Sequence, residues 1–227
     1  MTAQASAPCA LRIDVLHDAQ IAGARLEAIA ERTGGGQSRD AAQRVDAILE
    51  QVQQQGDAAL MELTERFDGV RPDPLRVPLA ALEAAWQATP EDLQEALKLA
   101  HRRIVDFHQR QKPADLEVTG VHGERLGRRW RPVERAGLYV PGGRASYPST
   151  VLMNAVPAKV AGVQRLVMVT PPGPDGQVNQ TVLAAAHLAG ISEIYRVGGA
   201  QAIAALAYGT ESIPRVDVIS GPGNLYV

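Results

Sequence analysis

The chain has 227 residues, of which 45% are hydrophobic, and its formal net charge is −2 at pH 7. This balance excludes a protein that depends on a large basic surface for binding nucleic acid or membranes. No run of 18 apolar residues is present, so no membrane span is expected. The single cysteine, Cys9, excludes an internal disulfide and a thiolate zinc cage, and the N-terminus lacks a secretory signal pattern, so the sequence predicts a cytoplasmic protein.

Residues 1–40 are predicted to form a short N-terminal segment and a linker. The run Gly34-Gly-Gly36 lacks side chains that restrict the backbone, as is typical of flexible connections. Residues 41–132 are predicted to form a helical region with a short hairpin, because apolar residues there recur at spacings of three and four. The predicted helices span Ala41–Gln54, Ala58–Phe67, Pro78–Ala88 and Pro90–Lys112.

Residues at the helix ends support these boundaries. Gly56 is expected to end the first helix, and Asp57 is expected to cap the start of the second. Thr89 is expected to cap the last helix, and Pro113 to end it, because proline cannot continue a helix. Three glycines within residues 117–131 predict a short hairpin that leads to the first strand of a sheet.

Residues 133–227 carry a different pattern, in which apolar runs are each followed by a glycine-rich turn. Only nine charged residues lie within 136–227, although the chain holds 23 basic and 25 acidic residues, and such a charge-poor region fits a sheet covered on both faces. The runs alternate with helical stretches, so we expect an α/β fold with an incomplete Rossmann-like parallel βαβαβαβ sheet. The predicted strands are Gly137–Val140, Arg165–Thr170, Glu193–Val197 and Val216–Ser220.

Three polar side chains lie at the turns of this predicted sheet, where parallel α/β sheets bind ligands. Gln201 and Asn224 follow two strand ends, and an amide can both donate to and accept from a ligand. Capping a helix or closing a turn would explain these amides equally well. Tyr139 precedes the first turn with an aromatic face and a hydroxyl, or is simply a half-buried strand residue.

The sequence contains no recognisable metal or catalytic cluster. His101 and His108 lie seven residues apart on one predicted helix, whereas metal-binding pairs on helices are usually three or four apart. The motif G-x-G-x-x-G and the serine nucleophile elbow are both absent. The residues by themselves therefore indicate a binding surface without catalytic apparatus.

The order of the motifs resembles that of histidinol dehydrogenase, from about Ala41 to Val227. In the sheet region, the motifs that carry the resemblance are Trp130-Arg-Pro132, Gly137-Leu-Tyr-Val-Pro-Gly-Gly143, Ser149-Thr-Val-Leu-Met-Asn-Ala-Val-Pro157, Ala186-His-Leu-Ala-Gly190, Gly198-Gly-Ala-Gln-Ala-Ile203 and Gly221-Pro-Gly-Asn224. In the helical region, they are Gly56-Asp-Ala-Ala-Leu60, Arg66-Phe-Asp68 and Ile104-Val-Asp-Phe-His108.

The resemblance implies an NAD-dependent, zinc-requiring enzyme that oxidises L-histidinol through L-histidinal to L-histidine and works as a homodimer. It implies that Tyr139, Gln201 and Asn224 contact NAD, within a half-domain spanning residues 133–227. Members of the family continue well beyond the position of Asn224 and carry their zinc ligands and acid/base pair there. This chain is therefore expected to be an N-terminal portion that is inactive alone and binds no zinc.

An alternative from another class is a non-catalytic α/β module that binds a nucleotide or a protein. The last predicted strand bears on the two alternatives. If nothing covers Val216–Ser220, Tyr226 and Val227, their apolar side chains should be partly exposed and the isolated chain should associate. A monodisperse monomer would favour the binding module.

Overall fold

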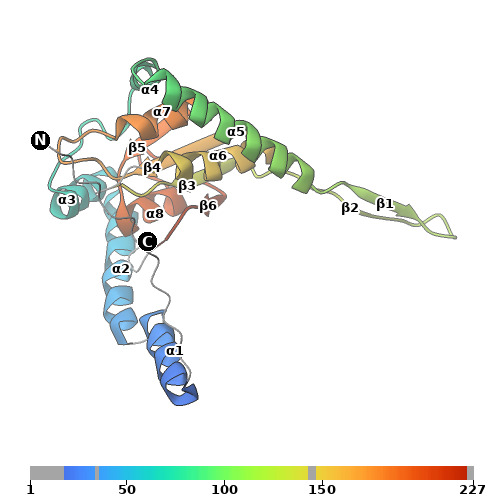
Figure 1. The fold of residues 1–227 in the computed structure, drawn as a ribbon, viewed down its shortest axis with the longest axis horizontal. Helices are drawn as coiled ribbons and strands as arrows, with labels where there is room; N and C mark the ends of the chain where they lie inside the picture. Colours follow the sequence, from blue (N-terminus) through green and yellow to red (C-terminus); the bar gives the residue numbers. More distant parts are fainter. Residues whose placement is uncertain (1–17, 34–35, 143–146, 224–227) are drawn as a thin grey trace, which may run out of the picture. The chain divides into compact units, whose positions relative to one another are not determined.

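A computed structural model describes residues 18–33, 36–142 and 147–223 (Figure 1). The chain divides into two compact units, residues 1–41 and 42–227. None of the helices in the described ranges is long and apolar enough to cross a bilayer. The predicted division of residues 41–227 at position 132 stays a prediction.

The N-terminal unit contains helix α1 (Ala19–Thr33) and the start of helix α2 (Gly36–Gln55). Asp18 begins α1, since its carboxylate accepts hydrogen bonds from the backbone N–H groups of Gln20 and Ile21 at 2.8 and 3.1 Å. The predicted glycine linker is wrong at Gly36, which is already helical, and residues 34–35 lie outside the described ranges.

Helix α3 (Asp57–Asp68) follows α2 after a single glycine. Gly56 has a φ of 56° and donates its N–H to Val52 O at 2.9 Å, so its predicted role at the end of α2 is confirmed. The predicted capping role of Asp57 is wrong, because its carboxylate accepts hydrogen bonds from the N–H and hydroxyl groups of Ser212 instead. Asp57 is the first helical residue of α3, and its side chain binds a loop that is distant in the sequence.

Helices α4 (Leu79–Gln87) and α5 (Glu91–Gln111) lie close to their predicted bounds. Thr89 does not cap α5 as predicted, because its hydroxyl donates to Ala85 O at 2.7 Å and so closes the end of α4. Pro90 occupies the capping position of α5 instead. The helix ends at Gln111, since Lys112 is extended before Pro113.

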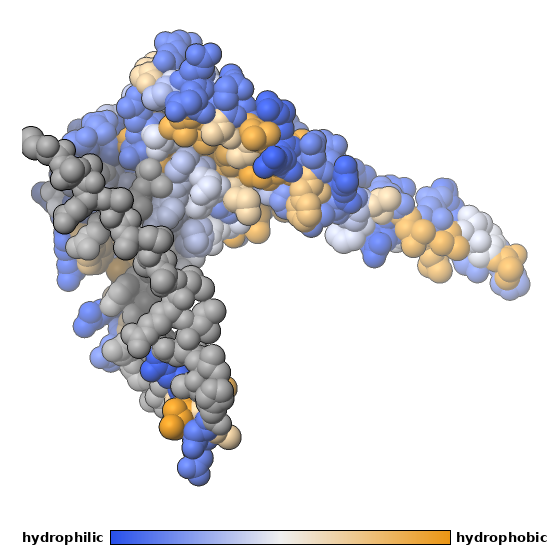
Figure 2. Space-filling model, in the orientation of Figure 1, coloured by the Kyte–Doolittle hydropathy of each residue, from blue (hydrophilic) through white to orange (hydrophobic). Residues whose placement is uncertain are grey.

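A two-stranded antiparallel hairpin follows α5, as predicted, and consists of β1 (Leu116–Thr119) and β2 (Arg125–Arg128). Val118 pairs with Leu126, which places both side chains on one face of the hairpin. Every residue of the two strands is exposed, and the hairpin projects beyond the end of α5 (Figure 1). Figure 2 shows hydrophobic residues on this projection.

The second sheet has the strand order β5-β4-β3-β6, with all neighbours parallel, so the predicted α/β Rossmann-like class is confirmed. Its strands are β3 (Arg135–Tyr139), β4 (Arg165–Thr170), β5 (Glu193–Arg196) and β6 (Val218–Ser220). The helices between them are α6 (Pro148–Ala161), α7 (Gln180–Leu188) and α8 (Gly199–Tyr208).

Helices cover both faces of this sheet, and alternate residues of the central strand β4 enter different cores. Met168 packs in a core with Leu82 of α4 and Leu152 of α6. Val167 packs on the opposite face with residues of α2, α3 and α8, including Leu206. This alternation follows from the two-residue period of a strand, and burial on both faces explains the lack of charges in this region.

Strand β6 forms one edge of the sheet. The predicted exposure of the last strand is confirmed at Val218, whose side chain is 47% exposed. It is wrong at Val216, which precedes β6 and is buried in the core that contains Leu206. Tyr226 and Val227 lie outside the described residues.

Candidate functional site

The turns that follow β3, β4 and β5 meet at one edge of the sheet, around Pro171. A Cβ atom added to Gly142 would lie 2.7 Å from the Pro171 ring, and one added to Gly198 would lie 2.6 Å from it. These distances are shorter than real Cβ contacts, so only glycine allows the turns to approach so closely. The glycine-rich turns therefore bring Tyr139 at the end of β3 next to the start of α8.

Tyr139 is 5% exposed, and its hydroxyl accepts a hydrogen bond from the N–H of Gly199 at 3.2 Å. Burial raises the pKa of Tyr139, and the nearby charge of Asp68 raises it further, while the bond from Gly199 opposes both effects. The phenol therefore stays protonated at neutral pH and keeps its own O–H as a donor. Tyr139 thus holds the first turn of α8 in place.

A cavity of about 410 Å³ lies at the N-terminal end of α8, between that helix and the end of α3. The residues that line it are Arg44, Ile48, Phe67, Asp68, Gly199, Ala200 and Gln201. Gln201 is 1% exposed, and its Oε1 atom has no hydrogen-bond partner. A buried carbonyl oxygen without a partner is costly, and a ligand that donates to it would remove that cost.

The backbone of Gly199 leaves room for this amide. Gly199 has a φ of 63°, and a Cβ at this position would lie 2.7 Å from Gln201 Oε1. Gln201 Oε1 has no hydrogen-bond partner in its own helix or elsewhere in the described part of the chain. Gln201 thus lines the cavity with a buried oxygen packed against the Gly199 backbone.

Asp68 lines the same cavity from the last position of α3. Its Oδ2 atom is buried and has no hydrogen-bond partner. Burial raises the pKa of Asp68, and a negative charge at the C-terminal end of a helix is also opposed by the helix dipole. Two residues that line the same cavity, one on α3 and one on α8, therefore each have a buried oxygen without a partner.

The structure brings Tyr139 and Gln201 together through Gly199, whereas Asn224 lies outside the described residues. The sequence reasoning did not select Asp68 or Phe67 as site residues. Both belong to the motif Arg66-Phe-Asp68, which supported the family resemblance but otherwise indicated only the end of a helix. No local pattern links this helix end to a turn more than 130 residues later.

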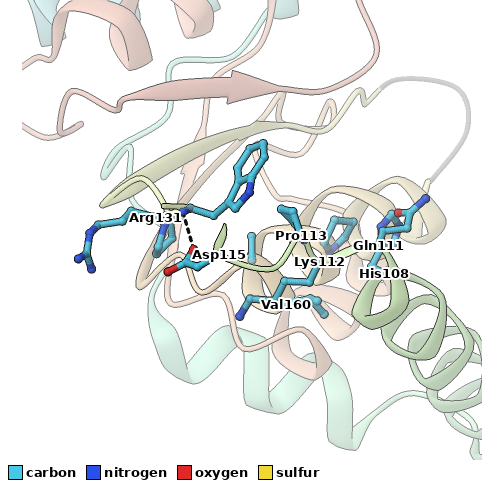
Figure 3. Close-up of a pocket in the computed structure, with 11 residues that line it drawn as sticks. His108, Gln111, Lys112, Pro113, Asp115, Arg131 and Val160 are labelled. Carbon is cyan, nitrogen blue, oxygen red and sulfur yellow. Dashed lines mark hydrogen bonds between the residues drawn. The ribbon is translucent and has the colours of Figure 1, made fainter. Parts of the chain in front are cut away.

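A second cavity, of about 510 Å³, lies where α5, the base of the hairpin and α6 come together (Figure 3). Lys112 and Arg131 on its wall are exposed, as is half of the Trp130 side chain. Its carboxylate, Asp115, already accepts a hydrogen bond from the N–H of Trp130 at 2.8 Å. No side-chain atom that lines this cavity is among the buried polar atoms without partners in the described structure.

A third cavity, of about 550 Å³, lies beside the turn after β4. Two of its polar side chains already accept hydrogen bonds from backbone N–H groups nearby in the sequence. Asp175 accepts from the N–H of Gln177 at 3.0 Å, and Asn179 accepts from the N–H of Thr181 at 2.9 Å as the cap of α7. These groups close the turn and begin the helix.

No group of three or more histidine, cysteine, aspartate or glutamate side chains that could hold a metal occurs within residues 18–33, 36–142 and 147–223. The described residues therefore do not fit a zinc site. The glycine-lined helix start, the unpartnered buried oxygens and the aromatic ring of Phe67 do fit a nucleotide.

Comparison with known proteins assigns the family. The family model described as histidinol dehydrogenase matches residues 31–227. The chain belongs to the histidinol dehydrogenase family. The resemblance identified from the sequence motifs is thereby confirmed.

Individual relatives agree with this assignment. The chain is 64% identical over 212 residues to histidinol dehydrogenase of Parasynechococcus marenigrum, covering 93% of this chain and 48% of the relative. It is 63% identical over 225 residues to that of Prochlorococcus marinus, covering 99% and 51%. The crystal structure of histidinol dehydrogenase from Elizabethkingia anophelis matches with a TM-score of 0.78 and 38% identity, over 81% of this chain and 42% of that one. The chain thus spans about half the length of these curated relatives.

Proposed function

We propose that the cavity between α3 and α8 binds NAD, and that Tyr139, Gln201 and Asn224 contact this cofactor. The observation that carries the proposal is Gln201, which lines the cavity and has a buried Oε1 atom without a hydrogen-bond partner. Membership of the histidinol dehydrogenase family supplies the expected substrate, L-histidinol. The protein would act in the cytoplasm as part of histidine biosynthesis.

The proposed reaction oxidises L-histidinol to L-histidinal and then, after addition of water, to L-histidine. NAD, when bound, accepts a hydride in each oxidation. The residues of this chain hold the cofactor in place. Tyr139 fixes the N–H of Gly199 and thereby the start of α8, and Gln201 offers an amide to the cofactor. The buried floor formed by Ala200 and Gln201 excludes water from one side of the site.

We propose that zinc binding and proton transfer belong to parts of the complete enzyme outside these 227 residues. The family resemblance implies a glutamine, histidine and aspartate ligand set and a glutamate-histidine acid/base pair, none of which matches a motif of this chain. We therefore expect the 227-residue chain alone to form no NADH from histidinol and to hold no stoichiometric zinc. A homodimer, also implied by the family, is part of the proposal for the complete enzyme.

Substitution of Gln201 by alanine tests the cofactor site. In a histidinol dehydrogenase of full family length that contains this sequence, one or two lost hydrogen bonds should raise the KM for NAD about two- to a hundredfold. The KM for histidinol should stay unchanged. An unchanged KM for NAD with a raised KM for histidinol would place Gln201 on the substrate side and refute the proposal.

A further inference from the structure

We propose that Asp68 binds the hydroxyl groups of the adenosine ribose of the cofactor and thereby selects NAD over NADP. This inference rests on the proposed function, since it assumes that the cavity between α3 and α8 takes a dinucleotide. It adds a specificity-determining residue from the helical region, outside the glycine-rich turns of the sheet.

The first argument is that the residues lining the cavity need hydrogen-bond donors from a ligand. Asp68 and Gln201 both line the cavity, and each has a buried hydrogen-bond acceptor, Oδ2 and Oε1, without a partner. A ligand group that satisfies them must donate hydrogen bonds. A ribose diol has two hydroxyl donors close together, whereas a phosphate at neutral pH offers mainly acceptors.

The second argument is charge. NADP differs from NAD by a phosphate on the 2′-hydroxyl of the adenosine ribose, and an acidic residue at this hydroxyl is the usual device that favours NAD. Asp68 forms none of the ion pairs found among the described residues. Its carboxylate would therefore repel the additional phosphate without compensation from a bound cation.

The third argument concerns the other side chains around the cavity. Arg44 is the one cation among the residues that line the cavity, and it is exposed at the rim. We assign Arg44 to the pyrophosphate that both cofactors share, a role in which it does not discriminate between them. Phe67, next to Asp68, leaves 52% of its side chain exposed and offers a ring on which a base can stack.

The fourth argument is that Asp68 lowers the stability of the folded protein when no ligand is bound. Its half-buried carboxylate stands at the C-terminal end of α3, where the helix dipole opposes a negative charge. Nothing in the described part of the chain satisfies its Oδ2 atom. A bound ribose would supply the missing donor, which gives this placement a function.

The test uses Asp68→Asn in the full-length enzyme, with NAD, NADP and an NAD analogue that lacks the 2′-hydroxyl of the adenosine ribose. We expect the ratio of kcat/KM for NAD to that for NADP to fall at least about tenfold, because asparagine loses the charge that repels the phosphate. Wild type should bind the deoxy analogue about tenfold more weakly than NAD, and Asp68→Asn should show a much smaller difference.

Two control variants separate the possible outcomes. Arg44→Ala should weaken NAD and NADP by the same factor, and Asp115→Asn, in the cavity at the base of the hairpin, should change neither. Either of two results would overturn the inference. One is a ratio of kcat/KM for NAD to that for NADP that is unchanged in Asp68→Asn. The other is a deoxy analogue that binds more weakly than NAD by the same factor in wild type and in the variant. The proposed function would survive that result as long as Gln201→Ala still raised the KM for NAD.

Discussion

The two cavities beside α3 and beside α5 differ in how their polar groups are satisfied. The cavity at the hairpin base is the larger, at about 510 Å³, but its carboxylate Asp115 is already hydrogen-bonded to Trp130. The cavity between α3 and α8 is smaller, at about 410 Å³, yet two of its lining residues, Asp68 and Gln201, each have a buried oxygen without a partner. Volume alone would favour the cavity at the hairpin base. The unsatisfied buried polar atoms favour the cavity between α3 and α8, because the fold gives them no other partner.

The largest expected effect comes from substituting Gly199, because a side chain there would displace the Gln201 amide at the smaller cavity. Gly199→Ala places a Cβ where it meets Gln201 Oε1 and forces a non-glycine residue to a φ of 63°. We expect a loss of stability of about 1–2 kcal/mol and a KM for NAD at least as high as in Gln201→Ala. Thermal unfolding and steady-state kinetics measure the two effects.

Gly190→Ala is the matched control for this substitution. Gly190 has a φ of 68°, but a Cβ there would meet nothing within 4 Å. It should therefore show a similar loss of stability with an unchanged KM for NAD. If both variants raised the KM equally, strain rather than the displaced amide would explain the result, and the comparison between the cavities would lose its support.

A smaller effect is expected from Tyr139→Phe, which removes one oxygen beside the cavity. The N–H of Gly199 would lose its acceptor at a part-buried site, so the start of α8 should loosen. We expect the unfolding free energy to fall by about 0.5–1 kcal/mol and the KM for NAD to rise about threefold. Tyr208→Phe, at the exposed end of α8, is the control and should change neither quantity.

The smallest effect is expected on stability in Asp68→Asn. Because burial raises the pKa of Asp68 in the folded protein, the folded state holds the proton more tightly than the unfolded state does. The carboxyl group therefore lowers stability progressively as the pH rises from the unfolded pKa through the raised folded pKa. At neutral pH, Asp68→Asn should stabilise the protein by about 0.3–1 kcal/mol, as expected for removing a charge that opposes the helix dipole.

Urea unfolding at several pH values would measure this effect. The gain should shrink when both proteins are compared below the unfolded pKa, where the aspartate is protonated in both states. A variant that is less stable than wild type at neutral pH would show that Asp68 has a stabilising partner in the fold.

The sequence was sufficient to predict most of the sheet, because its strands are buried on both faces and appear as continuous apolar runs. Strand β4, for example, has the predicted bounds Arg165–Thr170. The helix caps were predicted less well. Asp57 and Thr89 follow local capping rules in the sequence, but each side chain has a competing partner, Ser212 across the fold and Ala85 in the preceding helix.

The site was only partly predictable for the same reason. Tyr139 and Gln201 could be selected because they lie at strand ends within glycine-rich turns. Asp68 could not, because its proximity to Gln201 depends on how α3 packs against α8 across the sheet face that contains Val167. Such a contact arises from tertiary packing and leaves no periodic or spacing signal in the chain.

The most direct test of the account is a crystal structure of the full-length enzyme with NAD bound. The account predicts the adenosine ribose between Asp68 and Gln201, with hydroxyl groups within hydrogen-bond distance of Asp68 Oδ2 and the pyrophosphate toward Arg44. A cofactor bound instead at the base of the hairpin, against Trp130 and Lys112, would contradict it.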